Sequence, residues 1–509
     1  MLAAIKSLTL TGIEAKIIRV EVDIQNGLPA FDMVGLASGA TKEARERVRS
    51  AIKNSGFSFP NRRITVNLAP ADIKKEGSHF DLPIALGILI ASEQIPPMIT
   101  ENNYYCGELS LNGDLHKVPG ILPMALELAG LEEPVHFFIP EGNWQEAALV
   151  KEVSSAAIAD LKEIAAHFRE ELFWLGSDFL PHLTRPAPKH SLFHEVKGQE
   201  MAKRAMVIAA AGMHNVLLIG PPGSGKTMLA RRFPELLPEM NRNEVLETTR
   251  IYSAASLLDG QYPLIDTHPF RSPHKNASSS SIIGGGRIPR PGEISLAQNG
   301  VLFLDELPEF NRDVLEALRQ PLEDRTVTVA RTQATYTYPA NFIFIGGMNP
   351  CPCGFWGSDQ ACSCSPLQIK KYLGRISGPL LDRLDLHVEV PKLDLKQLQT
   401  SYEYTSIQKL KDSVLLARDR QRPRFTGQPS KLNAHMSPSE VAQYCVLEEK
   451  AQNLLVQAFS RLQLSARSYD RLLKISRTIA DLENSEKITV RFLTEALQYR
   501  SLDQKYWQP

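Results

Sequence analysis

Residues 215–227 read NVLLIGPPGSGKT, and they identify the fold class of the chain. The apolar run VLLI has no polar face, which is typical of a parallel strand covered by helices on both sides. Gly220–Thr227 then matches the pattern G-x-x-x-x-G-K-[ST] in full, and the helical segment TMLARRF follows. Strand, glycine-rich loop and helix in this order predict a phosphate-binding loop in an α/β domain.

Each residue of this loop is a candidate nucleotide contact. Its glycines let backbone N–H groups curl around phosphate oxygens, and the helix that follows adds the positive end of its dipole. Lys226 is expected to reach the β- and γ-phosphates, and Thr227 is expected to bind Mg²⁺. ATP and Mg²⁺ are therefore the predicted cofactors. The predicted cofactor-binding residues are Gly220, Pro221, Pro222, Gly223, Ser224, Gly225, Lys226 and Thr227.

Two later apolar strands end in polar residues that suit ATP hydrolysis. VLFLDE (301–306) ends in Asp305, which would hold Mg²⁺, and Glu306, which would polarise the attacking water. Without a phosphate-binding loop before it, this strand could equally end in ordinary surface carboxylates. NFIFIGGMNP (341–350) carries Asn349 at its tip, where a polar side chain can orient the water, although an Asn before Pro is also a common turn residue.

Length and composition constrain the rest of the chain. A chain of 509 residues is expected to form two to four domains. The 57 Lys and Arg residues equal the 57 Asp and Glu residues, so the overall charge predicts no partner. No apolar run approaches the ~18 residues of a membrane span. The N-terminus lacks the long apolar segment of a signal peptide. We therefore expect a cytoplasmic protein without a membrane partner.

The pattern of elements divides the chain into three parts. Residues 1–183 read as mixed α and β, with strands in IIRVEVDI and RRITVNLA, a helix that closes at Gly56, and a hairpin with an Asn-Gly turn in YYCGELSLNGDL. After a Pro-rich linker, residues 192–392 alternate strands and helices, which predicts a parallel sheet. Residues 393–509 read as helical. The basic stretch RDRQRPRFTGQPSK (418–431) interrupts them, as a flexible linker or a second nucleic-acid contact.

Four of the six cysteines lie within the fourteen residues CPCGFWGSDQACSC, 351–364. Four thiolates suit tetrahedral Zn²⁺, although each pair is C-x-C and the more usual spacing is C-x₂₋₄-C. Zinc would staple a loop too short and polar to fold alone. Disulfides, which the cytosol disfavours, and free structural cysteines are the alternatives. The predicted structural zinc ligands are Cys351, Cys353, Cys362 and Cys364.

Three longer stretches resemble the magnesium-chelatase-like, YifB/ComM family of AAA+ ATPases. They are PFRSPHKNASSSSIIGGGRIPRPGEISLAQNGVLFLDELPEF, VARTQATYTYPANFIFIGGMNPCPCG and RISGPLLDRLDLHVEV. The resemblance covers nearly the whole chain. It implies an α/β multidomain fold: a Lon-protease-like α+β domain at 1–183, a AAA+ core at 192–392 and a C-terminal helical lid at 393–509. It also implies a DNA branch-migration helicase of recombination and natural transformation.

The resemblance assigns roles to single residues. It implies that Asn349 is the sensor 1 residue. Arg467 in SARSYDRLL aligns with sensor 2, and Arg471 is its rival. Such a cation is needed because charge develops on the γ-phosphate during transfer.

By the same resemblance, Arg383 in LLDRLDL is the arginine finger, which acts on ATP held by the next subunit. A finger in trans implies a homo-oligomeric ring, expected to be a hexamer. The alternative is that Arg383 merely pairs with Asp382 or Asp385 on the surface.

The N-terminal domain departs from the Lon protease pattern that it resembles. In KKEGSHFDLPIAL (74–86), His79 stands at the position of the nucleophile and Ser78 is next to it. The catalytic lysine is expected in the segment that reads ILPMAL here, and Lys117 lies several residues too early. Both members of the catalytic dyad are missing, so we expect no proteolysis.

Local basic clusters are the candidate DNA contacts. They fall where AAA+ relatives insert loops into the ring pore, and no aromatic loop typical of a protein-threading pore is found there. The arginines are Arg287, Arg290, Arg325 and Arg331. The alternative is that these arginines are ordinary solvated surface charges. We expect a motor on single-stranded or branched duplex DNA, and the other reading is an ATP-dependent protein remodeller, chelatase-like or Lon-like.

Overall fold

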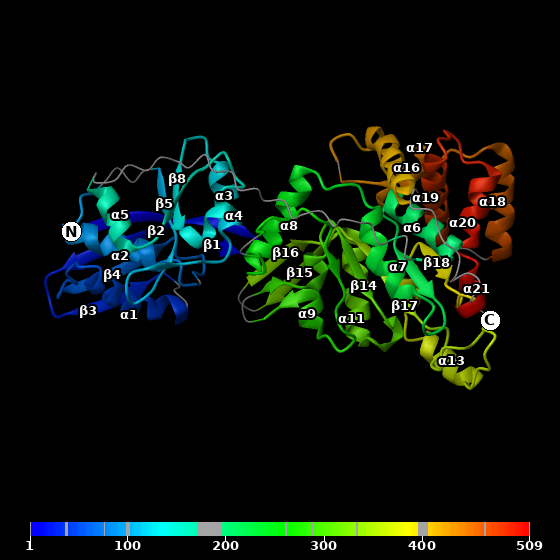
Figure 1. Ribbon diagram of the computed structural model, residues 1–509, viewed down its shortest axis with the longest axis horizontal. Helices are drawn as coiled ribbons and strands as arrows, with labels where there is room; N and C mark the ends of the chain where they lie inside the picture. Colours follow the sequence, from blue (N-terminus) through cyan, green and yellow to red (C-terminus); the bar gives the residue numbers. More distant parts are fainter. Residues whose placement is uncertain are drawn as a thin grey trace. The chain divides into compact units, whose positions relative to one another are not determined.

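The computed structural model describes residues 2–35, 39–75, 77–97, 102–169, 193, 196–259, 262–286, 289–331, 334–394, 406–428, 430–462 and 465–507. The chain forms two compact units. The first contains Met1–Arg185 with Val245–Ile265, and the second contains Pro186–Glu244 with Asp266–Pro509 (Figure 1). The predicted α/β class with several domains is confirmed. No described helix is both long and apolar enough to cross a membrane.

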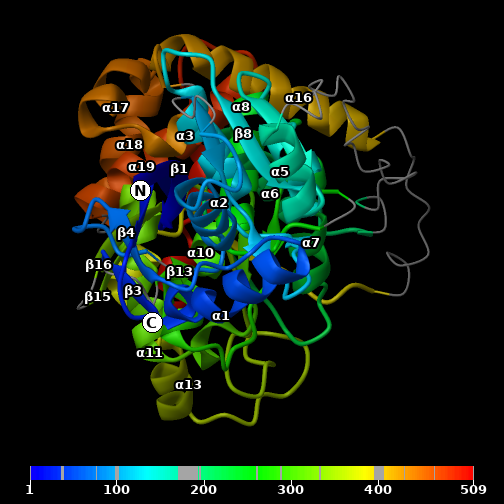
Figure 2. The same cartoon turned by 90° about the vertical axis from the view of Figure 1, so that its left-hand side faces the viewer.

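The first unit is built on a seven-stranded mixed sheet in the order β3-β4-β2-β1-β5-β8-β9. Alternate residues of its strands point to opposite faces. One face packs against α1, α2 and α5, and the other packs against α3 and α4 (Figure 2). The strands are β1 (Leu2–Thr11), β2 (Glu14–Gln25), β3 (Ala30–Val34), β4 (Arg63–Ala69), β5 (Asn103–Tyr105), β8 (His136–Pro140) and β9 (Ser154–Ile158). The helices are α1 (Gly39–Asn54), α2 (Asp81–Ala91), α3 (Ile121–Ala129), α4 (Trp144–Ala147) and α5 (Leu161–Phe168).

Two local predictions in this unit are confirmed. Helix α1 ends at Asn54, and Gly56 follows with a φ of +87°, the left-handed conformation that closes many helices. The predicted hairpin pairs β6 (Glu108–Leu109) with β7 (Leu115–His116), and Gly113 in its turn has a φ of +96°.

The second unit is built on a five-stranded sheet in the order β11-β14-β17-β10-β18, and every pair is parallel. The strands are β10 (Val216–Ile219), β11 (Phe270–Arg271), β14 (Val301–Leu304), β17 (Ile343–Met348) and β18 (Leu386–Glu389). Every residue of β10, β14 and β17 is buried, as the apolar runs predicted. Because these strands are parallel neighbours, the segments that follow them meet at one edge, the carboxyl edge of the sheet.

The C-terminal helices share one hydrophobic core with this sheet. Helices α16 and α19 pack against α6 (Glu200–Gly212), which lies on the sheet. Helices α7 (Lys226–Arg232), α9 (Ser279–Ile283), α10 (Glu293–Leu296), α11 (Arg312–Ala317), α12 (Arg319–Asp324), α13 (Pro366–Leu373) and α14 (Gly378–Leu381) lie between the strands in sequence. Helix α8 (Arg242–Ala254) begins in the second unit and ends in the first. The C-terminal helices are α16 (Ser406–Gln421), α17 (Pro438–Tyr444), α18 (Glu449–Leu462), α19 (Ala466–Leu482), α20 (Val490–Gln498) and α21 (Leu502–Trp507).

Two small hairpins are inserted into this core. The first pairs β12 (Gly284–Gly285) with β13 (Arg290–Pro291) just before β14. The second pairs β15 (Thr326–Arg331) with β16 (Ala334–Pro339) just before β17. The hydroxyl of Tyr338, a buried residue of β16, donates to the carbonyl oxygen of Pro289 at 2.7 Å. This bond ties the two hairpins together.

The prediction for the basic stretch 418–431 is wrong over its first half. Helix α16 continues to Gln421, and a short 3-10 turn follows at Arg422–Phe425. Arg418 donates to the carbonyl oxygen of Ala210 at 2.7 Å, and Arg424 donates to the carboxylate of Asp481 at 2.6 Å. These arginines therefore fasten the C-terminal helices and are engaged inside the unit. The local charge run did not reveal this, because their acceptors lie far away in sequence.

Candidate functional site

The carboxyl edge of the five-stranded sheet holds the predicted nucleotide site. The phosphate-binding loop leaves β10 at Gly220, where an added Cβ atom would lie 2.1 Å from the carbonyl oxygen of Val390. Gly223 and Gly225 have φ angles of +74° and +92°, which side chains rarely tolerate. The glycines that the motif requires are thus needed by the loop conformation itself, and the loop fits a bound phosphate group.

Lys226 lies buried inside this loop. Its ammonium group donates to the carbonyl oxygens of Gly220 and Pro221, at 2.7 and 3.0 Å, and to Oδ1 of Asn349 at 3.2 Å. Burial lowers the pKa of Lys226, and the nearby carboxylates of Asp305 and Glu306 act in the opposite direction. All three acceptors are neutral oxygens, so an anionic phosphate is a stronger partner that can replace them.

The predicted Mg²⁺ ligands lie together at the same edge. Oγ1 of Thr227 donates to Oδ2 of Asp305 at 2.6 Å, so one hydroxyl and one carboxylate converge where the cation would sit. Glu306 is the next residue and has a left-handed φ of +52°. Its carboxylate forms an ion pair of 2.6 Å with Lys275, which raises the pKa of that lysine. Lys275 is a site residue that sequence reasoning missed, because nothing in its local pattern indicates a partner 31 residues away.

The two predicted arginines of the site lie elsewhere. Arg383 precedes β18 at the opposite, amino edge, and the four residues of that strand span about 13 Å. Its guanidinium group forms an ion pair with Glu323 and donates to the carbonyl oxygen of Pro379 at 2.7 Å. Only 10% of its side chain is exposed. The proposed partners Asp382 and Asp385 are thus not the ones used, and Glu323 is a second residue that the sequence did not indicate.

Arg467 is exposed and also lies far from the phosphate-binding loop of its own chain. The direction of α19 shows this. Thr478 contacts His214, which lies directly before β10 at the amino edge, whereas Glu483 at the end of α19 contacts Arg204 of α6. The helix therefore comes from beyond the amino edge and passes it near Thr478. The first turn of α19, which holds Arg467, therefore lies beyond the amino edge. The structure does not bring this residue together with Lys226, Asp305 and Asn349.

A buried polar network occupies the amino edge. The carboxylate of Asp385 contacts Nδ1 of His214 at 3.2 Å and a guanidinium nitrogen of Arg471 at 3.4 Å. Burial opposes ionisation of Asp385, but the charge of Arg471 and the hydrogen bond with His214 outweigh it, so the pKa of Asp385 is held below its usual value. Nε2 of His214 contacts the hydroxyl of Thr478 at 2.8 Å, so the network joins the sheet to α19. Arg471, the rival for sensor 2, is thereby engaged inside the chain.

The four candidate DNA contacts differ in position. Arg290 is exposed on β13, and Arg331 ends β15 directly before its turn. Arg287 lies outside the described residues. Arg325 donates to the carbonyl oxygen of Phe342 at 3.0 Å, and burial lowers its pKa to about 10. The structure corrects the assignment of Arg325 as a DNA contact, because its guanidinium group faces the interior.

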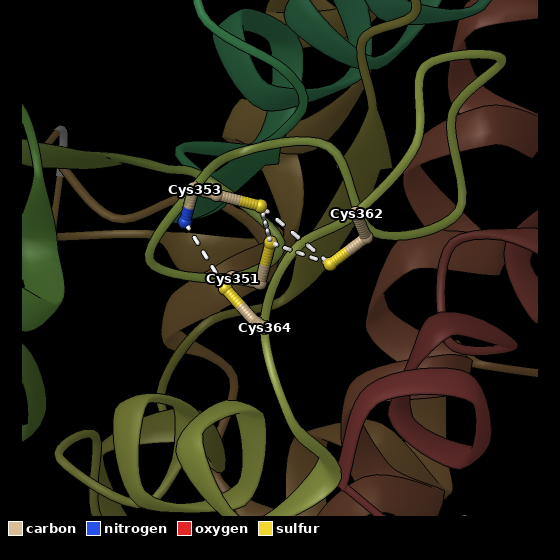
Figure 3. A group of neighbouring side chains, drawn as sticks. All are labelled: Cys351, Cys353, Cys362 and Cys364. Atoms are coloured by element: carbon tan, nitrogen blue, oxygen red, sulfur yellow. Dashed lines mark hydrogen bonds between the residues drawn. The ribbon is translucent and has the colours of Figure 1, made fainter.

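The four clustered cysteines point their sulfur atoms toward one another (Figure 3). The Sγ atoms all lie within 4.8 Å of one another, and three pairs are 3.3, 3.5 and 3.7 Å apart. A Zn–S distance of about 2.3 Å in a tetrahedron requires sulfur atoms about 3.8 Å apart, whereas a disulfide requires about 2.05 Å. Backbone N–H groups of Trp356 and Cys353 donate to Sγ of Cys351 and Cys364, at 3.3 and 3.4 Å. The four residues fit a tetrahedral metal ion.

In the first unit, the residues near the positions expected for a Lon-type dyad contact other groups. His79 is buried, and burial lowers the pKa of its ring to about 4. Ser78 donates to the carboxylate of Glu108, and buried Lys75 donates to the carbonyl oxygen of Pro70. None of these contacts pairs a serine with a lysine, as a Lon-type dyad would require.

Comparison with known families matches three segments of the chain. The model described as magnesium chelatase, subunit ChlI, matches residues 192–398. The models for subunit ChlI of Mg-chelatase and for the ChlI C-terminal region match residues 20–143 and 405–500.

Two relatives resemble the chain over nearly its full length. The chain is 43% identical to competence protein ComM of Haemophilus influenzae over 514 residues, which cover 98% of each protein. It is 44% identical to the uncharacterised protein YifB of Escherichia coli over 97% of this chain and 96% of the relative. The magnesium-chelatase subunit ChlI of Euglena gracilis is 22% identical over 40% of this chain and 58% of the relative. The chain therefore belongs to the YifB/ComM family of magnesium-chelatase-like AAA+ proteins.

Proposed function

We propose that the protein is a ring-forming ATPase that couples ATP hydrolysis to movement along DNA, and that it drives branch migration in homologous recombination during natural transformation. ATP hydrolysis is supported by the arrangement of four residues at one sheet edge: Lys226, Thr227, Asp305 and Asn349. The proposed role in natural transformation is supported by the 43% identity to a relative named as a competence protein. The two linked hairpins support DNA as the substrate.

The hydrolytic roles follow from the contacts at the carboxyl edge. When bound, ATP with Mg²⁺ supplies the phosphoryl group that is transferred to water. Lys226 would exchange its neutral acceptors for the β- and γ-phosphates, and Thr227 and Asp305 would hold the cation. Glu306 would polarise the attacking water once it leaves Lys275, and Asn349 would orient that water. Hydrolysis thus requires the Lys275–Glu306 ion pair to open.

The observation that carries the DNA proposal is the short path from Glu306 to Arg290. Lys275, the partner of Glu306, lies four residues before α9, and α9 leads directly into the β12–β13 hairpin. Arg290 is exposed on that hairpin, and the Tyr338–Pro289 bond carries any shift to the second hairpin. Arginines that move with the nucleotide state would convert hydrolysis into steps along a phosphate backbone, with little sequence preference.

The ring proposal depends on Arg383. It lies at the amino edge, away from the phosphate-binding loop of its own chain, so any ATP that it contacts belongs to another subunit. Its present partner, Glu323, has a side chain that is 54% exposed. The Arg383 side chain is only 10% exposed, so leaving Glu323 costs more than breaking a surface ion pair, and the charge of the γ-phosphate must replace that of the carboxylate. We propose a hexameric ring in which Arg383 exchanges Glu323 for a neighbour's γ-phosphate.

We also propose that each chain binds one structural Zn²⁺. Its ligands are Cys351, Cys353, Cys362 and Cys364. The sulfur spacing fits tetrahedral zinc without rearrangement, and four thiolates fill every coordination position. We therefore assign the metal no part in the hydrolytic step. For the first unit, we propose a role in assembly or DNA binding without proteolysis, because Ser78 and Lys75 are engaged separately.

The test offers the purified protein synthetic three-strand and four-way branched DNA with ATP. We expect branched DNA to stimulate ATP hydrolysis and to be separated, and both effects to weaken steeply with salt. The Arg290→Ala variant should lose DNA-stimulated hydrolysis and keep basal hydrolysis. Exposed Lys371 lies on α13, outside both hairpins, so Lys371→Ala is the matched control. Stimulation by unfolded protein in place of DNA would favour the remodeller.

A further inference from the structure

The cysteine loop lies against the nucleotide site. Strand β17 ends at Met348, Asn349 follows, and Cys351 comes two residues later. Asn349 accepts the hydrogen bond of Lys226 at 3.2 Å. Asn349, which contacts the lysine of the phosphate-binding loop, is therefore separated only by Pro350 from Cys351, the first candidate metal ligand.

A second contact joins the cysteine loop to the phosphate-binding loop itself. Gly354 has a φ of +88°, and its backbone N–H donates to the carbonyl oxygen of Cys351 at 3.0 Å. A Cβ atom added at Gly354 would lie 2.5 Å from Cδ of Pro222 and 3.8 Å from Cγ of Asn349. The backbone of Gly354 thus packs directly on Pro222, the third residue of the phosphate-binding motif.

The far side of the loop is fastened next to the same motif. The Trp356 ring packs edge-on against Tyr506 of α21, with centroids 5.4 Å apart. Tyr506 and Lys505 both contact Oε1 of Glu389, the last residue of β18, at 3.1 and 2.7 Å. The next residue, Val390, donates to the carbonyl oxygen of Ile219 at 2.7 Å, directly before Gly220. The loop therefore contacts Pro222 directly and is linked to Ile219 through Tyr506 and the end of β18.

Besides its packing on Pro222 and Tyr506 and a few turn hydrogen bonds, the thiol cluster is what joins the two ends of the loop. No helix or strand lies between Met348 and Pro366, a segment that the structure describes throughout. Of its four cysteines, only Cys351 is buried. A metal ion closes such a polar loop by removing conformational freedom from the open chain. Loss of the metal would leave Gly354 and Asn349 free to withdraw from Pro222 and Lys226.

We propose that the four-cysteine loop is a positioning element for the nucleotide site, so that zinc held by its cysteines sets the affinity for ATP. This inference rests on the zinc site proposed above and requires neither DNA nor a ring. Zinc holds Gly354 against Pro222, which keeps the phosphate-binding loop in its binding conformation, and it holds Asn349 beside that loop while Lys226 turns from Asn349 to the phosphates. Coupling between two sites is reciprocal, so bound nucleotide also tightens zinc by the same factor.

The first experiment measures binding of a fluorescent ATP analogue to the full chain, without DNA and with excess Mg²⁺. Removing zinc with a zinc-selective chelator should weaken binding about tenfold, within the range typical of coupled sites. Adding zinc back should restore it. In the reverse direction, a non-hydrolysable ATP analogue should raise the zinc affinity, measured by competition with a chelator of known affinity, by the same factor.

The second experiment compares two alanine variants of the loop. Gly354→Ala places a methyl group against Pro222, whereas Gly357→Ala has a similar positive φ of +75° and would meet only Cε of Lys505, at 4.0 Å. Both should retain zinc by elemental analysis, and only Gly354→Ala should bind the analogue more weakly. Equal binding by the two variants, together with zinc-independent binding by the wild type, overturns the inference and leaves the zinc proposal intact. A chain that holds no metal overturns both.

Discussion

At the carboxyl edge of the five-stranded sheet, Lys226 donates only to neutral carbonyl and amide oxygens. At the amino edge, Asp385 faces Arg471, and Arg383 faces Glu323. The first kind of partner yields to a phosphate, because a charged acceptor binds an ammonium group more strongly than a carbonyl oxygen does. The second kind is already matched in charge. The same sheet therefore presents a site prepared for a ligand at one edge and a cross-link between elements at the other.

Arg383 is the residue that breaks this contrast, since the proposed ring requires it to leave Glu323. Arg383→Ala should lower ATP turnover about 10³-fold or more, as expected for an arginine finger. Mixing variant and wild-type subunits should inhibit the rings more than the variant fraction predicts. Turnover that falls only in proportion to that fraction would assign Arg383 to the Glu323 cross-link alone. The Glu323→Gln variant should keep turnover near that of the wild type.

The carboxyl edge is tested by Glu306→Gln. This variant should bind ATP normally and turn it over about 10²- to 10⁴-fold more slowly, the contribution typical of a positioned general base. Lys226→Ala should instead lose nucleotide binding, because no other described residue of the loop offers an ammonium group there. Analogue binding and steady-state hydrolysis separate the two effects. Normal turnover by Glu306→Gln would remove this residue from the hydrolytic step.

The amino edge is tested by Asp385→Asn, which leaves Arg471 without its buried carboxylate partner. Removing one member of a buried ion pair costs about 3 kcal/mol of stability, so the melting temperature should fall. The folded-state pKa of Asp385 lies below its ordinary value of 3.8. Its contribution is therefore present above that pH and is lost as the pH falls below it.

Thermal scans of both proteins at several pH values check this. The advantage of the wild type should be constant near neutral pH and should shrink in acid below about pH 4. An advantage that stays the same at low pH would show that the carboxylate charge is not the source of the stability. Asp382→Asn is the control, because Asp382 also adds a negative charge near Arg471, whereas Asp385 is the carboxylate that contacts it at 3.4 Å.

The smallest expected effect concerns the hairpins. Arg290→Ala should reduce the slope of log affinity for branched DNA against log salt by about 1 in magnitude, the effect of losing one phosphate contact. Basal hydrolysis should stay at the wild-type rate, because Arg290 is an exposed residue of β13 and not one of the residues placed in the nucleotide site. Binding isotherms at several salt concentrations measure the slope. An unchanged slope would place Arg290 outside the DNA interface.

The confirmed predictions share one property. The apolar strands, the hairpin with Gly113 and the close of α1 at Gly56 all depend on residues that are neighbours in sequence. The failed ones concern where a charged side chain points. Arg325 and the basic stretch at 418–424 look like surface charge, yet Arg325 donates to Phe342 and Arg424 reaches Asp481, 57 residues away. A run of charged residues does not indicate which group each side chain contacts, because that group belongs to a segment distant in sequence.

The sequence by itself determined the nucleotide-binding loop, the order of strands and helices, and the grouping of four cysteines in one loop. These features follow from backbone conformation, burial and chelation, which act between residues close in the chain. Only the tertiary structure decided that Lys275 holds Glu306, that Glu323 holds Arg383, and that Gly354 rests on Pro222. These contacts join segments that are distant in sequence. Their geometry is set by the parallel sheet, which brings the ends of separate strands to a common edge.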